Sequence, residues 1–436
     1  MKFKHLLLAV LCCGLLITSL FYKQSFGLNL FLFDLLLMSW LILNGQLKWR
    51  HPNEILLATG FILSGLFTVL TFSVFSYMMH FVTAFLFIGV LNYSKVRSLV
   101  TALGLSFSSI IQAPVEFVSQ WSKSNGRGRR YGSLLWRARI FVLPILVVGV
   151  FIVIYSFSNP FFGDMVNSMG TGMENGVTFL FEGLDLGWIS TFVLSLLISV
   201  YLLVRARNKE METSDTIATN NLVRTRSKIP RRFGLTALKN EYKAGIFLLV
   251  VLNLLLLTLN VMDMYWVWFN FAWEGQTLKQ YVHEGTYMLI FSILISIGVV
   301  LFFFRRNLNF YSKNKWLKIL SYAWIAQNGI LAISVAVRNL RYIEYFSLAY
   351  KRIGVVIFLL LVGYGLYTVF RKIRDKKSTY FLFRTNARAA FVILLVASFI
   401  NWDGVIARYN FAHAPESYLH LSYVSRLSDK ALPELD

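Results

Sequence analysis

The sequence is dominated by apolar runs of about 18 to 24 residues that recur along the whole chain. A helix needs about 20 predominantly apolar residues to cross the ~30 Å hydrocarbon layer of a bilayer, so each run can span it once. Apolar and polar residues do not alternate in these runs, which disfavours a transmembrane β-barrel. The sequence therefore predicts an all-α, polytopic transmembrane helix bundle of about eleven spans. The predicted spans are 5–22, 28–45, 54–73, 75–93, 138–157, 188–204, 243–262, 284–304, 317–336, 353–370 and 388–405.

Composition agrees with this class. Of the 436 residues, 57% are hydrophobic and 15% are charged, which is too apolar for a soluble protein. The adjacent Cys12 and Cys13 lie in the first run, where they form neither a disulfide framework nor a metal site. The bulky residues from Ile17 to Tyr22 offer no small-residue cleavage site, so we predict an uncleaved first span instead of a signal peptide.

The basic residues are distributed unevenly between the loops. With the N-terminus inside and the C-terminus outside, 34 of the 43 Lys and Arg fall on inside segments and 9 on outside segments, whereas 13 of the 21 Asp and Glu lie outside. Basic residues of membrane proteins concentrate on the cytoplasmic side, so the charges support this orientation. The formal net charge of +22 is then a basic fringe beside anionic lipids, and we predict no nucleic-acid partner.

Segment 99–117 is the ambiguous part of this threading, because Pro114, Glu116 and several serines interrupt its apolar residues. If it crossed the membrane fully, the basic residues of 123–139 would lie on the opposite side from those that precede it. We therefore predict a re-entrant or interfacial segment. The chain divides into a four-span region at 1–136, a two-span region at 137–242 and a five-span region at 243–436.

Two loops between the predicted spans are long. The outer loop 159–187 contains six glycines and four acidic residues, and we predict a flexible acidic loop. The inner loop 205–241 is polar and has too few apolar residues to bury a core, so we predict a linker or a docking strip.

The stretch 337–352, between two spans, carries four basic residues where the outer face should be poor in them. In a helix, Arg338, Arg341, Tyr342 and Tyr345 fall at i, i+3, i+4 and i+7, which gives one cationic and aromatic side. We interpret the stretch as an amphipathic hinge. Its basic residues either bind an anionic ligand or anchor the hinge to lipid phosphates. The candidate ligand-binding residues here are Arg338, Arg341, Glu344 and Arg352.

Two other polar stretches lie, by the same threading, at the outer face. One opens the span 284–304, and its His283 and Glu284 can titrate, bind a cation or pair with an arginine. The other, 401–410, follows the last span. A structural role for these groups stays open. The candidate ligand-binding residues of the two stretches are His283, Glu284, Asp403, Arg408 and Asn410.

Short loops make the last spans neighbours, so we expect the three stretches to converge into one site at the outer face. Unpaired charges are costly where headgroups exclude water. We therefore expect Arg338 or Arg341 to contact Glu344, Glu284 or Asp403. The remaining cations would be available to an anionic small molecule or a lipid headgroup.

The same stretches resemble a family of bacterial inner-membrane proteins known only as a domain of unknown function (DUF4153/DUF4173-like). Residues 281–285 resemble its Tyr-Val-x-Glu-Gly segment, and residues 401–410 resemble its Asn-x-Asp-x-x-Ile-Ala-x-x-Asn segment. Residues 346–352 resemble its Tyr-Gly-Leu-Thr-x-x-Arg segment, with Ser347 in place of Gly and Ala349 in place of Thr.

This resemblance covers roughly residues 240–410. It implies a multi-pass protein of the bacterial inner membrane, and it implies no particular activity. It points to the same three stretches as the charge distribution does.

Asp34 is the carboxylate placed well inside a predicted span. A charge at such depth costs about 2.5–3.5 kcal/mol unless it is paired, protonated or hydrated, so Asp34 should face the bundle or a water-filled cavity. Two roles follow. Asp34 either bonds to a neighbouring helix or takes part in a proton or ion relay that couples to transport.

Catalytic and metal signatures are mostly missing. His283-Glu284 resembles the start of a zinc-protease motif, but Tyr287 stands where the second histidine is needed, so we predict no metal and no cofactor. Three classes of function remain. We rank first a protein that binds, senses or transports an envelope solute or lipid, second a scaffold that contacts other envelope proteins, and third an enzyme acting on a lipid headgroup.

Overall fold

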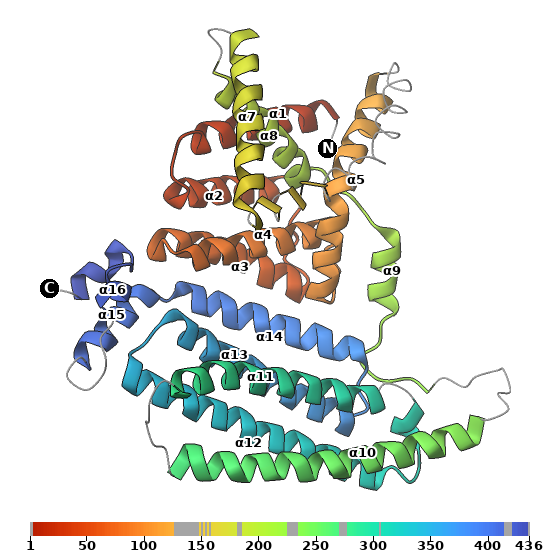
Figure 1. Ribbon diagram of the computed structural model, residues 1–436. Coiled ribbons are helices and arrows are strands. Elements are labelled where there is room, and N and C mark those ends of the chain that lie inside the picture. Colours follow the sequence, from red (N-terminus) through yellow and green to blue (C-terminus); the bar gives the residue numbers. More distant parts are fainter. Residues whose placement is uncertain are drawn as a thin grey trace. The chain divides into compact units, whose positions relative to one another are not determined.

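The computed structural model (Figure 1) describes residues 3–125, 148–149, 151–152, 155–156, 158–180, 185–224, 234–269, 277–304, 307–413 and 421–434. The named elements in these residues are helices, and one isolated antiparallel bridge joins Asn221 to Lys377. Eight of the described helices are long and apolar enough to cross a membrane, and three shorter apolar helices accompany them. The all-α membrane class predicted from the sequence is confirmed. The predicted span 138–157 lies largely outside the described residues.

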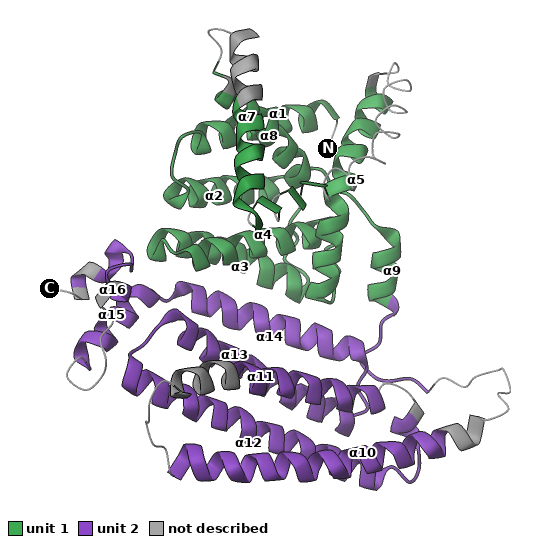
Figure 2. Ribbon diagram, in the orientation of Figure 1, with its two compact units in different colours: residues 1–216 green, residues 217–436 purple. Residues whose placement is uncertain are grey.

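The chain forms two compact units, Met1–Thr216 and Ile217–Asp436 (Figure 2). The division falls within the inner loop 205–241 of the predicted threading. Each unit contains several helices that are long and apolar enough to cross a bilayer.

In unit 1, six helices form a ring of successive contacts. The order around the ring is α1, α2, α3, α4, α5 and α8, and α8 contacts α1. Two glycines allow close approach. A Cβ at Gly89 of α4 would collide with the backbone of Ala102 in α5, and one at Gly14 of α1 would meet Leu196 of α8. The bounds are α1 (Phe3–Phe21), α2 (Gly27–Leu43), α3 (Pro52–Thr71), α4 (Val74–Asn92), α5 (Leu99–Asn125) and α8 (Leu186–Leu203).

The ambiguous segment 99–117 lies in α5, which continues as one helix for 27 residues with Pro114 inside it. It is long and apolar enough to cross a membrane. The stretch predicted as a flexible loop contains helix α7 (Pro160–Leu180) instead. Its glycines lower helix propensity, but apolar residues recur at helical spacing and favour a helix. These residues are Phe162, Met165, Val166 and Met169.

The inner loop begins with a short helix, α9 (Lys209–Ile217), that is bonded to unit 1. The Asp215 carboxylate accepts hydrogen bonds from the backbone N–H of Arg97, at 2.7 Å, and from Thr101 Oγ1, at 2.9 Å. Arg207 pairs with Glu212 beside them. The first part of this loop is therefore a docked segment of the chain itself.

In unit 2, α12 contacts α10, α11 and α13, and α13 contacts α14 (Figure 1). The core between these helices is built from Leu, Ile, Val and Phe side chains with Trp324. The predicted span 317–336 is the first part of a longer helix that continues through Arg338 to Phe346. The bounds are α10 (Gly234–Asp263), η1 (Met264–Phe269), α11 (Thr277–Phe303), η2 (Asn307–Phe310), α12 (Lys315–Phe346), α13 (Tyr350–Arg374), α14 (Thr379–Phe399), α15 (Trp402–Ala412), α16 (Leu421–Val424) and η3 (Asp429–Glu434).

Amide side chains join α10 to α12 in one register. Asn253 Nδ2 donates to the Leu320 carbonyl and Asn260 Nδ2 donates to the Gln327 carbonyl, each at 3.1 Å. Gln327 Nε2 in turn donates to Asn253 Oδ1 at 2.8 Å. Both backbone contacts join residues 67 apart in the sequence, so the two helices run parallel. Such bonds each contribute about 0.6 kcal/mol in a membrane and fix the register of the pair.

Candidate functional site

The predicted hinge is a sharp turn between α12 and α13. The backbone at Ser347 has φ 65° and ψ 173°, a combination that is essentially restricted to glycine. Ser347 is also buried. The family segment that this stretch resembles has Gly at this position, and the backbone conformation gives the physical reason. The turn is therefore built with a strained residue in this chain.

Asn410 of α15 closes the turn. Its Nδ2 donates to the Leu348 carbonyl at 3.0 Å, and its Oδ1 accepts from the Leu348 N–H at 2.6 Å. The Asn410 side chain is buried, so it satisfies both polar groups of a backbone unit that no helix can satisfy. The second and third sequence motifs thus touch each other directly.

Asp403, about two helical turns earlier in α15, makes a second link. Its carboxylate accepts from Tyr350 Oη at 2.8 Å and from Ser428 Oγ at 2.6 Å. The hydroxyl of Tyr423 accepts from the Tyr350 N–H at 3.1 Å, and burial raises the pKa of Tyr423, which keeps that hydroxyl neutral. The start of α13 is therefore held by residues from the C-terminal part of the chain.

The arginines of the hinge have different environments. Arg338 is buried and pairs with Asp263 of α10, and Ser334 donates to the same carboxylate. Arg352 donates to the Phe346 carbonyl at 2.7 Å, and its guanidinium lies 4.4 Å from the centre of the Tyr342 ring. These two cations stabilise the helix ends, and the partner of Arg338 is a residue that sequence reasoning missed.

Among the predicted site arginines that the structure describes, Arg408 is exposed and Arg341 is partly exposed. Arg341 contacts Glu344 at 3.2 Å, one of the pairings expected from the sequence. Arg408 borders a hollow of about 580 Å³ along α15, next to Tyr409 and His413, whose rings stack with centroids 4.2 Å apart. Anion binding by these two arginines stays a prediction.

His283 and Glu284 belong to α11, but their side chains lie outside the described part of the structure. Their convergence with the other two stretches stays a prediction as well. Among the described residues, no group of three His, Cys, Asp or Glu side chains that could hold a metal ion is present.

A second site lies in unit 1 around Asp34 of α2. The residue is 1% exposed, and its Oδ1 lies 3.6 Å from His80 Nε2 of α4. His80 Nδ1 lies 3.1 Å from Ser64 Oγ of α3, which fixes the orientation of the ring. Asp34 Oδ2 is buried and has no hydrogen-bond partner in the described structure. Sequence reasoning missed His80, although a histidine inside the apolar span 75–93 was a usable signal.

Asp34 and His80 border a cavity of about 510 Å³. Residues of α1, α2, α3, α4 and α8 line it, and the exposed side chains of Phe81 and Leu194 lie on its open side. Gly65 of α3 leaves room for the carboxylate, because a Cβ there would collide with Asp34 Oδ2. The Phe61 ring lies against His80, with ring centres 5.3 Å apart. The result is a mostly apolar cavity with one carboxyl group, that of Asp34, in its lining.

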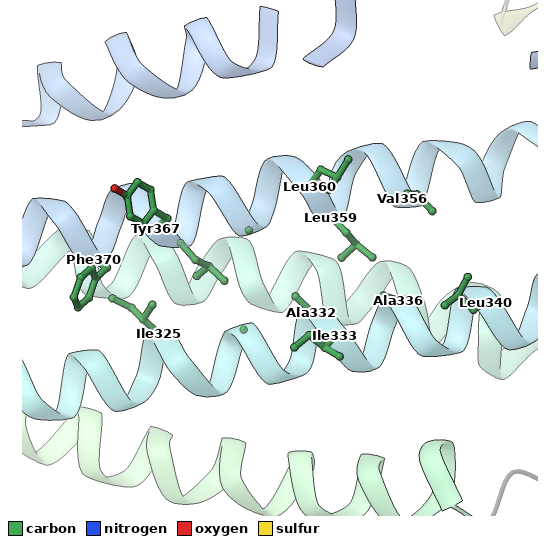
Figure 3. A pocket seen from close by; sticks show the side chains of 13 residues that line it. Ile325, Ala332, Ile333, Ala336, Leu340, Val356, Leu359, Leu360, Tyr367 and Phe370 are labelled. Carbon is green, nitrogen blue, oxygen red and sulfur yellow. The ribbon is translucent and has the colours of Figure 1, made fainter. Parts of the chain in front are cut away.

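Unit 2 has a groove of about 580 Å³ between α12 and α13 (Figure 3). Figure 3 shows Leu340 and Val356 near one end and Tyr367 and Phe370 near the other. The lining has no charged group. The groove therefore offers dispersion contacts but no electrostatic anchor that would distinguish one molecule from another.

The helices and the buried polar residues define an integral, multi-pass membrane protein. The family model described as a domain of unknown function (DUF4153) matches residues 6–436, and the chain belongs to this family. The match extends well beyond the residues 240–410 on which the resemblance rested. No curated protein matches the chain, and no solved structure does.

Proposed function

We propose that this membrane protein binds an amphiphilic molecule of the bilayer in the cavity of unit 1. The apolar chain of the ligand lies among the aliphatic and aromatic side chains, and its polar head lies at Asp34. The observation that carries the proposal is the buried carboxyl group of Asp34, which borders the cavity and whose Oδ2 has no hydrogen-bond partner among the described residues.

Burial makes this oxygen informative. A buried polar group without a partner costs about 1–3 kcal/mol, and the cost for a carboxylate is larger. Almost all buried polar groups in proteins are satisfied, so an exception points to a ligand or to water. The cavity volume of about 510 Å³ falls in the range of small-molecule sites, about 300–1,000 Å³.

We further propose that the protein lies in a bacterial inner membrane with its N-terminus inside and its C-terminus outside. The split of 34 to 9 basic residues supports this orientation. A cavity surrounded by membrane helices gives access to molecules dissolved in the bilayer, so binding there suits the transport or sensing of a lipid-like molecule. This proposal moves the ligand site from the predicted outer-face cluster to unit 1.

Photo-crosslinking tests the proposal. The purified protein in phosphatidylcholine nanodiscs is irradiated with a hexadecanol that carries a diazirine near the end of its chain, and adducts are mapped by peptide mass spectrometry. We expect adducts on buried residues that line the cavity, such as Phe33 and Phe61.

Ala84→Phe should remove these adducts because Ala84 lines the cavity. The matched control is Val82→Phe, two residues earlier on α4, where the side chain is 50% exposed and lies outside the lining. Adducts that occur equally in wild type and in Ala84→Phe would show that the probe labels only the outer surface, which would overturn the proposal.

A further inference from the structure

We propose that the cavity of unit 1 selects long-chain amines and holds the ligand as an ammonium cation paired with Asp34. This inference rests on the proposed function and names its substrate class. The sequence suggested an anionic ligand because the whole protein is basic. The cationic ligand proposed here follows instead from the residues that line the cavity.

The lining contains a single acidic side chain without a cationic partner. Its polar and titratable residues are Asp34, His80, Thr191, Ser195 and Tyr201, and it contains no Lys or Arg. His80 Nε2 is 3.6 Å from Asp34 Oδ1, which is too long for a strong charge-assisted hydrogen bond. A positive group that reaches the Asp34 carboxyl group from the cavity would supply the missing partner.

The walls of the cavity also suit a cation. The ring faces of Phe and Tyr carry negative electrostatic potential and attract an ammonium group, most strongly where water is excluded. Seven such rings border the cavity. They belong to Phe21, Phe26, Phe33, Phe61, Phe81, Phe85 and Tyr201.

Entry of an amine requires no separated charge in the hydrocarbon. A neutral amine that diffuses from the bilayer meets the protonated Asp34 carboxyl, the O–H bond breaks, and the proton forms a new N–H bond. The product is an ammonium carboxylate pair with the same total charge as the reactants. A fatty acid gains no such pair, and a fatty alcohol gains only a hydrogen bond.

Gly65 supports the same arrangement from the opposite helix. The absence of a side chain there makes room for Asp34 Oδ2, because a Cβ at Gly65 would collide with this oxygen. Ser64, the residue before it, holds His80 through Nδ1. α3 therefore orients His80, one neighbour of the carboxylate, and accommodates its second oxygen.

The experiment compares three probes with the same diazirine-bearing hexadecyl chain and different heads: an amine, an alcohol and a carboxylic acid. Each is presented in nanodiscs of zwitterionic phosphatidylcholine, and cavity adducts are normalised to adducts on the exposed Val82. We expect the amine to exceed the alcohol by about tenfold, with the acid lowest. Asp34→Asn should reduce the yield of cavity adducts from the amine probe to the yield from the alcohol probe.

Asp185→Asn is the matched control, since Asp185 is a partly exposed carboxylate of unit 1 that accepts from Tyr22 and lies outside the cavity. It should leave the tenfold ratio unchanged. Equal amine and alcohol adducts in the wild type would overturn the amine inference and leave the proposed function standing. Absence of cavity adducts from all three probes would overturn the proposed function itself. If Asp34→Asn fails to fold, the wild-type ratio decides alone.

Discussion

Breaking the buried ion pair between Asp263 and Arg338 should destabilise unit 2 strongly. Both side chains are about 5% exposed or less, so neither charge regains full hydration when the other is removed. Removing one partner of a buried pair costs about 3–5 kcal/mol because the remaining charge stays buried without compensation. We expect a loss in this range for Asp263→Leu and for Arg338→Leu.

The double variant separates the pair from simple packing loss. Replacement of a buried ion pair by two apolar residues of similar size is often close to neutral. Asp263→Leu with Arg338→Leu should therefore lose less than either single variant. Ser334→Ala removes only the hydroxyl that donates to Asp263, and about 1 kcal/mol is expected for it.

The measurement is the free energy of unfolding from titration with sodium dodecyl sulfate in mixed micelles, followed by circular dichroism. The interaction energy is obtained from the double-mutant cycle. Two results would refute this reasoning: single variants that each lose less than about 1 kcal/mol, or a double variant whose loss equals the sum of the two single losses.

Three other predictions use the same or simpler assays. Ser347→Gly should raise the free energy of unfolding by about 1 kcal/mol, because glycine adopts the observed backbone angles without strain; a decrease would contradict this. Asn410→Ala should lower it by about 2–4 kcal/mol, since both polar groups of Leu348 lose their partner; a loss under about 1 kcal/mol would contradict this. Topology reporters inserted at positions 228 and 428 should report opposite sides of the membrane, and the same side for both would end the proposed orientation.

The sequence predicts the spans well because their hydropathy is a local property. The predicted spans that fall on described residues coincide with helices from α1 to α13, whereas the last one, 388–405, is wrong at its end because α14 stops at Phe399 and α15 begins at Trp402. Helix ends are less predictable. α12 continues ten residues beyond the predicted end at 336 because Arg338, which hydropathy counts as a break, is neutralised by Asp263 of another helix. Hydropathy is calculated from local sequence, so it does not include a charge partner on another helix.

The candidate site was less predictable for the same reason. The importance of Asp34 follows from its depth in an apolar run, and the structure buries it as expected. Its neighbours depend on three helices meeting at one point, so Ser64 and Gly65 carried no local signal. His80 did carry one, since a histidine in an apolar span needs a partner just as an aspartate does.

The two sites also differ in what their polar groups contact. In unit 2, Asp403 and Asn410 direct their side-chain oxygens at groups of the chain itself, which is how a residue holds a turn together. In unit 1, Asp34 borders a cavity and has an oxygen without a hydrogen-bond partner among the described residues. Because an unsatisfied buried carboxylate destabilises the protein that contains it, a fold that tolerates one has a reason outside its own stability. This contrast supports a structural role for the described motifs of unit 2 and is the basis for proposing the ligand site in unit 1.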